Sequence, residues 1–93
     1  MPDTEETKEI KEIIVKAFTD LVERINSDYT ILKNIDMHGN FFSSTELYSL
    51  GLFKNGELKN YICVKNDSID ILYQRISNLV LTVIQEVTHD EVI

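Results

Sequence analysis

The side chains most often used in catalysis and metal binding are few in this chain and far apart. Cys63 is the single cysteine, and the two histidines, His38 and His89, are not close to it in sequence. A metal site requires His, Cys or carboxylate ligands clustered at set spacings, and a cysteine nucleophile requires a neighbouring base. We therefore interpret Cys63 as a buried free thiol and both histidines as surface residues, and we expect no bound metal.

Sequence patterns typical of other enzymes are missing as well. The three glycines are isolated, so they form no phosphate-binding loop. Two scattered histidines offer no arrangement of a serine nucleophile with its base. Adjacent carboxylates occur near the chain ends, at Glu5-Glu6 and Asp90-Glu91, where a general acid could not be desolvated. We predict that the protein is not an enzyme, has no catalytic residue and binds no cofactor.

Four lysines in the middle of the chain are the candidates for contact with nucleic acid: Lys33, Lys54, Lys59 and Lys65. Residues 29–66 carry a net charge of +1, whereas residues 1–28 and 67–93 each carry −4 within the total of −7. Aromatic side chains between lysines, here Tyr48 and Tyr61, can stack on bases. The negative charge of the whole chain disfavours non-specific binding to nucleic acid or to an anionic membrane. A second interpretation stays open, in which the lysines are solvated and the tyrosines belong to the core or to an interface.

Residues 4–27 are expected to form a helix. Their apolar side chains follow one another at alternating spacings of three and one, which places them on one helical face. The members of this stripe are Ile10, Ile13, Ile14, Ala17, Phe18, Leu21, Val22 and Ile25. The opposite face is charged and contains the pairs Glu12–Lys16 and Asp20–Arg24, which favour a helix. We expect this helix to bury its stripe against one face of a sheet.

The middle of the chain is typical of β-strands, which we place at about 30–37, 46–53 and 58–65. Asn55-Gly56 lies between two apolar runs. This dipeptide is the strongest short signal for a hairpin, because a type I′ turn requires positive φ at both central residues. A two-residue loop would pair Phe53 with Leu58.

Continued without interruption, this register makes both faces of the sheet apolar. One face would carry Leu47, Phe53, Leu58, Ile62 and Val64. The other would carry Tyr48, Leu50, Leu52, Tyr61 and Cys63. A sheet that is apolar on both faces must be covered on both. The helices can cover one face, and a second subunit could cover the other.

Residues 44–65 also allow a different interpretation. They could form two short helices, with Ser44 as an N-cap and Gly51 in the turn, which would resemble a helix-turn-helix. The β-branched and aromatic residues of 58–64 favour the hairpin.

A second helix is expected over 68–88, capped by Asn66-Asp67-Ser68. Its apolar stripe consists of Ile69, Leu72, Tyr73, Ile76, Leu79, Val80, Val83, Ile84 and Val87. Ile71 and Leu81 lie off the stripe and widen the apolar surface. A helix this apolar is buried on more than one side, so we expect part of it in a subunit interface.

Interface hot spots are enriched in aromatic residues. The interface candidates are therefore Tyr48, Phe53, Tyr61 and Tyr73, together with Ile71 and Leu81 of the second helix. Small domains often gain stability by forming oligomers, and a homodimer is the expected state.

The order of elements predicts an α+β fold, in which a three-stranded antiparallel β-meander lies between two long helices. A chain of 93 residues is long enough for a single domain, which we place at 1–93. It contains no run of 18 apolar residues and no signal-peptide pattern. We therefore expect a cytoplasmic protein that does not bind a membrane.

One segment resembles a known family. Leu50–Tyr61, followed by Val64 and an apolar helix that an Asp initiates, is similar to the core of the YbaB/EbfC-type nucleoid-associated proteins. The resemblance covers about residues 46–88. It implies a homodimer that binds DNA.

Two functions follow from these observations. The first is a small acidic homodimeric protein-interaction module, such as an adaptor, a chaperone-like protein or an inhibitor, with an unidentified protein as partner. The second is a DNA-associated dimer of the nucleoid-protein type, which would use the four lysines.

Overall fold

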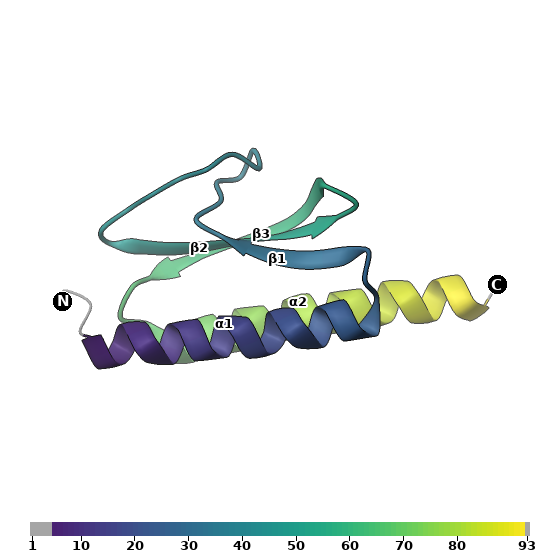
Figure 1. Ribbon diagram of the computed structural model, residues 1–93, viewed down its shortest axis with the longest axis horizontal. Helices are drawn as coiled ribbons and strands as arrows, with labels where there is room; N and C mark the ends of the chain where they lie inside the picture. The colour runs from purple at the N-terminus through teal and green to yellow at the C-terminus, as the bar shows by residue number, and fades with distance from the viewer. Residues whose placement is uncertain (1–4, 93) are drawn as a thin grey trace.

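The computed structural model describes residues 5–92, with side chains up to His89 (Figure 1). The elements, in order, are helix α1 (Glu5–Ile25), strands β1 (Tyr29–Lys33), β2 (Leu47–Lys54) and β3 (Glu57–Lys65), and helix α2 (Ile69–Val92). Both neighbouring strand pairs are antiparallel, and the order in the sheet is β1-β2-β3. The predicted α+β fold, with a β-meander between two long helices, is therefore confirmed.

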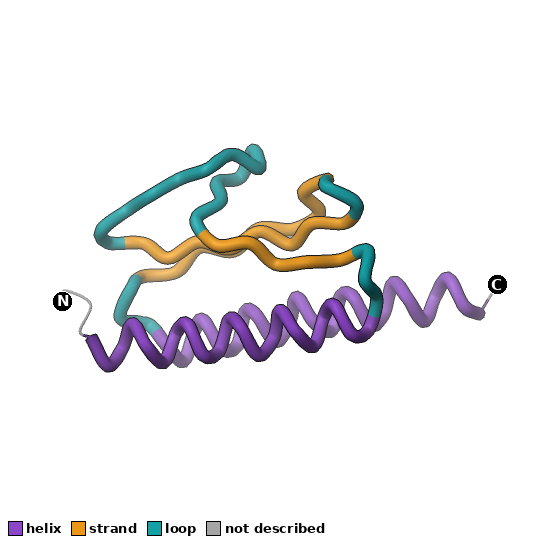
Figure 2. The backbone as a smooth tube through the Cα atoms, viewed as in Figure 1, coloured by secondary structure: helices purple, strands orange, loops and turns teal. Residues whose placement is uncertain are grey.

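Both helices lie on the same face of the sheet and form a second layer (Figure 2). Four chain reversals separate α1 from α2, so the two helices run in the same direction (Figure 1). They are in contact, since the rings of Phe18 and Tyr73 meet edge to face with centroids 5.6 Å apart. The segment 34–46 lies over the opposite face of the sheet (Figure 1).

The ends of α1 differ slightly from the predicted range of 4–27. Residue 4 lies outside the described residues, and the helix ends at Ile25. Beyond it, the Asn26 side-chain oxygen accepts a hydrogen bond from the Asp28 amide at 2.9 Å. Asn and Asp favour such local bonds over helix continuation, which explains the earlier end.

α1 buries a narrower stripe than its sequence predicts. Val15 and Val22 are buried in the core, and Phe18 packs against it. Four members of the predicted stripe are exposed instead: Ile10, Ile13, Ala17 and Leu21. The stripe covers a wide arc of the helix, whereas the sheet and α2 contact only part of that arc. The remaining apolar side chains stay on the surface.

β1 is shorter than the predicted strand of 30–37 because Asn34 has a φ of 60° and interrupts the extended backbone. The chain then forms a tight turn, in which the Asp36 carboxylate accepts hydrogen bonds from the His38 and Asn40 amides at 2.8 and 3.0 Å. An isolated bridge between Ile35 and Phe41 closes this turn.

β2 and β3 form the predicted hairpin. Asn55 and Gly56 have φ angles of 52° and 82°, as a type I′ turn requires. The helix-turn-helix interpretation of residues 44–65 is therefore wrong, because the segments 47–54 and 57–65 are strands.

The predicted assignment of side chains to the sheet faces is wrong for β3. Phe53 pairs with Leu58 as expected, but a register shift between Leu52 and Phe53 places Leu50 opposite Ile62. Such a shift is a β-bulge, and an extra residue reverses the facing of every residue beyond it. Two groups of residues therefore change faces relative to β2. Ile62 and Val64 join Tyr48, Leu50 and Leu52 against the helices, and Tyr61 and Cys63 share the other face with Phe53.

That other face is covered in part by the chain itself, through the segment 34–46. Ile35 and Phe53 are both buried. A Cβ at Gly51 would lie 3.0 Å from the Ile35 side chain and 2.9 Å from those of Leu58 and Phe53. Ile35 of the segment 34–46 therefore fills, together with the Leu58 and Phe53 side chains of the sheet, the space beside residue 51.

α2 runs from Ile69 to Val92 and is longer than the predicted 68–88. Its first turn is joined to the capping segment by the Leu72 amide, which donates to the Ser68 carbonyl at 3.0 Å. Its buried side chains face the sheet and α1; they are Leu72, Ile76, Leu79, Val80 and Val83. With Tyr29, Ile31, Leu50, Leu52 and Val64 they make up most of the core.

Candidate functional site

The outward side of α2 exposes apolar side chains that the fold does not use. Tyr73 and Leu81 are 56% and 54% exposed, and Ile71 and Ile84 are 39% and 41% exposed. We call the exposed side chains from Ile71 to Gln85, other than Arg75, the α2 strip. Exposed apolar surface of this extent is a common mark of a protein contact.

The α2 strip carries no charge. Arg75 is the single charged residue between Ile71 and Gln85, and it donates a hydrogen bond to the Cys63 carbonyl at 3.0 Å. Its guanidinium is therefore turned toward the edge of β3. The other exposed side chains of the strip are isoleucines and neutral amides, namely Ile71, Gln74, Asn78, Ile84 and Gln85.

The exposed apolar residues of α1 adjoin this strip. Phe18 links the two helices through its ring contact with Tyr73. On the outer side of α1, Ile13 and Leu21 are exposed, and so is Ile10. The helix layer therefore presents an apolar outer surface, in which α2 is uncharged and α1 is interspersed with charges such as the Lys16–Asp20 pair.

Two of the six predicted interface residues lie inside the protein. Tyr48 is half-buried and packs against the core, and Phe53 is buried beneath the segment 34–46. The sequence analysis placed them on an interface because they are aromatic residues of a sheet that is apolar on both faces. The helices pack over Tyr48 and the segment 34–46 lies over Phe53, so neither residue is among the exposed large apolar side chains.

Tyr61 lies half-buried on the sheet face opposite the helices. A hydrogen bond with the Cys63 side chain raises the pKa of the Tyr61 hydroxyl, and burial raises it further. The nearby charge of Asp36 acts in the same direction. Cys63, predicted to be a buried thiol, is half-buried.

The four lysines do not form one surface. Lys54 and Lys59 lie at the hairpin end of the sheet, whereas Lys33 ends β1 at one edge and Lys65 ends β3 at the other. The Lys59 ammonium is 3.6 Å from the Glu57 carboxylate. The Lys54 ammonium lies 5.4 Å from the centre of the Tyr29 ring.

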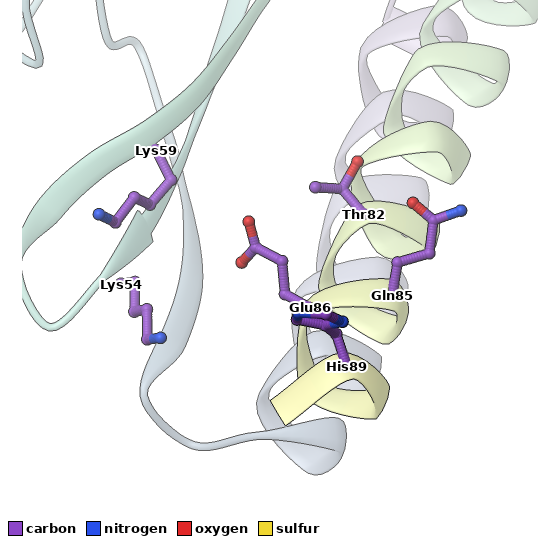
Figure 3. A pocket seen from close by; sticks show the side chains of 6 residues that line it. All are labelled: Lys54, Lys59, Thr82, Gln85, Glu86 and His89. Carbon is purple, nitrogen blue, oxygen red and sulfur yellow. The ribbon is translucent and has the colours of Figure 1, made fainter. Parts of the chain in front are cut away.

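A polar groove of about 630 Å³ separates Lys54 and Lys59 from the C-terminal half of α2 (Figure 3). Its α2 side consists of Thr82, Gln85, Glu86 and His89. The Tyr29 hydroxyl donates a hydrogen bond to the Glu86 carboxylate, which ties the sheet to α2. Most of the lining side chains are exposed, so solvent screens their charges. The groove can hold polar groups, but it offers no desolvated acid–base pair.

The turn at 36–40 carries a second apolar surface. Met37 is 67% exposed and Phe41 is 77% exposed. The Asn40 amide, and after it the His38 amide, lower the pKa of the Asp36 carboxyl by hydrogen bonding to its charged form. The turn is therefore held by a carboxylate that stays ionised to a lower pH than usual.

Lys11 is the residue that sequence reasoning missed most clearly. It belongs to the charged side of the predicted helix, yet it is 2% exposed. Its ammonium donates to the Asn66 side-chain oxygen at 3.2 Å and lies 4.7 Å from the centre of the Tyr48 ring. A lysine whose partners are distant in sequence has no local signal that distinguishes it from the exposed lysines of the same helix.

The described residues contain neither a cluster of metal ligands nor a helix that could span a membrane. Within residues 5–92, no three His, Cys, Asp or Glu side chains gather closely enough to hold a metal ion. Neither α1 nor α2 is long and apolar enough to cross a membrane over the part of the chain that is described. Comparisons with models of protein families, with curated proteins and with solved structures find no match to this chain.

Proposed function

We propose that the protein is a non-enzymatic, homodimeric protein-interaction module, and that two copies meet through their α2 strips. The observation that carries this proposal is the combination of exposed Tyr73 and Leu81 with the absence of any charged residue from Ile71 to Gln85 other than Arg75, which is bound to the Cys63 carbonyl. Adaptors, chaperone-like proteins and inhibitors are the functions that such a module serves. The free thiol of Cys63 supports a reducing compartment such as the cytoplasm.

Charge favours the α2 strip over the rest of the surface as a contact between identical copies. Each copy carries a net charge of −7, so most pairs of surfaces would bring like charges together. An uncharged strip avoids this repulsion and also loses no ion hydration when it is buried. Burying its apolar side chains contributes about 25 cal/mol for each Å² removed from water.

The outer surface of α1 extends the contact area. A stable interface commonly buries about 800 Å² on each partner, which exceeds what one side of a single helix provides. Ile10, Ile13 and Leu21 lie in the same helix layer and are exposed. We therefore assign α2 to the centre of the interface and α1 to its margin.

Leu81→Glu tests this proposal because it places a charge at the centre of the strip. Glutamate is a good helix former, so the substitution changes the surface without breaking α2. Met37→Glu is the matched control, since it adds the same charge at a similarly exposed apolar residue outside the strip. Sedimentation equilibrium should show a dimer for the wild type and for Met37→Glu, and a monomer of 10.8 kDa for Leu81→Glu. A wild-type monomer, or equal dissociation of both variants, would contradict the proposal.

A DNA-associated dimer is the alternative, and the pairing of Lys54 and Lys59 at one end of the sheet supports it. Both lysines line the groove in Figure 3. Phosphate contacts are strongest at low salt, so a gel shift should appear there and should weaken when both lysines are replaced by alanine. If no shift is detected at low salt, the DNA function is ruled out.

A further inference from the structure

The two edges of the sheet differ in how their backbone groups are satisfied. In an antiparallel pair, hydrogen-bonded and non-hydrogen-bonded residue pairs alternate. The Asn66 amide donates to the Glu46 carbonyl at 2.9 Å, so the even-numbered residues of β3 beyond the bulge bond to β2. The backbone groups of Tyr61, Cys63 and Lys65 therefore point out from the edge.

Side chains and the next turn protect this β3 edge. The Asn60 side-chain oxygen accepts a hydrogen bond from the Tyr61 amide at 2.9 Å. The Arg75 guanidinium donates to the Cys63 carbonyl at 3.0 Å, and the Ser68 amide donates to the Lys65 carbonyl at 3.0 Å. The bulge next to Lys59 adds to these features. Such devices keep another strand from pairing with an edge.

The β1 edge is open by comparison. The Asn34 amide donates to the Ser49 carbonyl, and the Asn55 amide donates to the Asp28 carbonyl, each at 2.9 Å. By the same alternation, Ile31 and Lys33 direct their amides and carbonyls away from β2. In the part of the chain that the structure describes, no side chain bonds to these four groups.

A groove runs alongside this open edge, between β1 and α1. It has a volume of about 270 Å³. The buried side chains of Val15 and Ile31 form its apolar floor, and Glu12, Lys16, Asp20 and Lys33 lie around it. Lys16 is paired with Asp20 at 3.4 Å. A strand added to β1 would place alternate side chains in this groove.

We propose that the β1 edge binds an extended segment of a partner protein that carries basic side chains at alternate positions. Backbone pairing with Ile31 and Lys33 would supply the hydrogen bonds, as in other strand-addition complexes. A lysine of the partner would lay its apolar stem along Val15 and direct its ammonium to Glu12. The net charge of −7 also favours a basic segment.

A second copy of this chain fits the edge less well than a basic peptide. Glu12 and Glu23 lie on the side of α1 next to β1, where Glu12 lines the groove and the Glu23 carboxylate accepts a hydrogen bond from Thr30 at 3.4 Å. Two copies joined at β1 would bring these acidic flanks together. The proposal rests on the proposed interaction function for the nature of the partner, but it uses a surface separate from the α2 strip.

An alternating Lys-Val hexapeptide with blocked ends is the probe for this proposal. Titration of the isotope-labelled protein should shift the amide signals of residues 29–33 and slow the hydrogen exchange of the Ile31 and Lys33 amides. The same peptide with alternate backbone nitrogens methylated is the control, because it keeps the charge and loses the backbone donors. Equal binding of both peptides, or signal changes confined to other residues, would overturn the proposal.

Lys33→Pro and Lys33→Ala form a matched pair of variants. Both remove the lysine charge, but only proline removes the outward amide, and proline is tolerated where the amide faces away from the sheet. Loss of one hydrogen bond should weaken peptide binding about two- to tenfold for Lys33→Pro relative to Lys33→Ala. Equal affinities would contradict the proposal.

The oligomeric state of Lys33→Pro separates the two interfaces. If its sedimentation mass equals that of the wild type, the β1 edge is not the dimer contact and the peptide site stands apart from it. A drop to 10.8 kDa in Lys33→Pro but not in Lys33→Ala would show that a second copy occupies the edge, which overturns the peptide proposal.

Discussion

The two helices cover the same face of the same sheet, yet their outer sides differ. α1 alternates exposed apolar residues with charges, as in the segment from Glu12 to Asp20. α2 has one charged residue between Ile71 and Gln85, and that residue, Arg75, is bound to the edge of β3. A helix needs one apolar side to cover a sheet. The uncharged outer side of α2 is therefore surplus to the fold and is the surface that we assign to a partner.

Leu79→Ala and Leu81→Ala provide the strongest test of this difference between the inner and outer sides of α2. Leu79 is 2% exposed, so its truncation should lower the free energy of unfolding by about 2–5 kcal/mol. Leu81 is exposed, and its truncation should change that free energy by less than about 0.5 kcal/mol. Urea denaturation at a concentration where the protein is monomeric measures both. Similar losses would mean that Leu81 belongs to the core of the monomer.

Lys11→Ala and Lys16→Ala compare a buried and an exposed lysine of α1 in the same way. Lys11 is buried, bonded to Asn66 and in contact with Tyr48. Its removal leaves the half-buried Asn66 side-chain oxygen without this donor and leaves a cavity beside Tyr48, which should together cost about 1–3 kcal/mol. Lys16 is an exposed lysine of the same helix, and its removal should cost less than about 0.5 kcal/mol. Equal thermal denaturation midpoints for the two variants would show that the Lys11 contacts do not stabilise the fold.

Added salt should change the dimerisation constant only slightly, and the direction of that change shows whether ion pairs contribute to the interface. The α2 strip is uncharged, so added salt would screen only the repulsion between two copies of charge −7. Sedimentation at rising salt concentration should therefore show dimerisation that strengthens by a few fold. Weakening with salt would point to ion pairs in the interface and would move the contact from α2 to the charged outer side of α1.

The elements that depend on local signals could be predicted from the sequence. The amphipathic patterns predicted both helices, and Asn55-Gly56 predicted the hairpin, because positive φ is a property of those two residues. The β3 faces were not predictable in this way. A single bulge between Leu52 and Phe53 reverses them, and it has no sequence signature of its own.

Features that depend on distant contacts could not be predicted. The bond between Tyr29 and Glu86 joins residues that are 57 positions apart, and the burial of Lys11 depends on Asn66 and Tyr48. Coverage of the second sheet face by the segment 34–46 likewise requires the turn at Asp36 to fold back over the sheet. For the candidate site, the excess of apolar residues on the second helix was visible in the sequence, whereas the exposure of Ile10, Ile13 and Leu21 was not.

Contacts between two copies of the protein are the most direct test of the α2 strip as the dimer interface. A sample that mixes isotope-labelled and unlabelled protein reports, through isotope-filtered nuclear Overhauser effects, only contacts between different copies. We predict such contacts to the Leu81 methyl groups and the Tyr73 ring. Their absence at concentrations of hundreds of micromolar, or contacts confined to Met37, Phe41 or β1, would contradict the assignment of the α2 strip as the dimer interface.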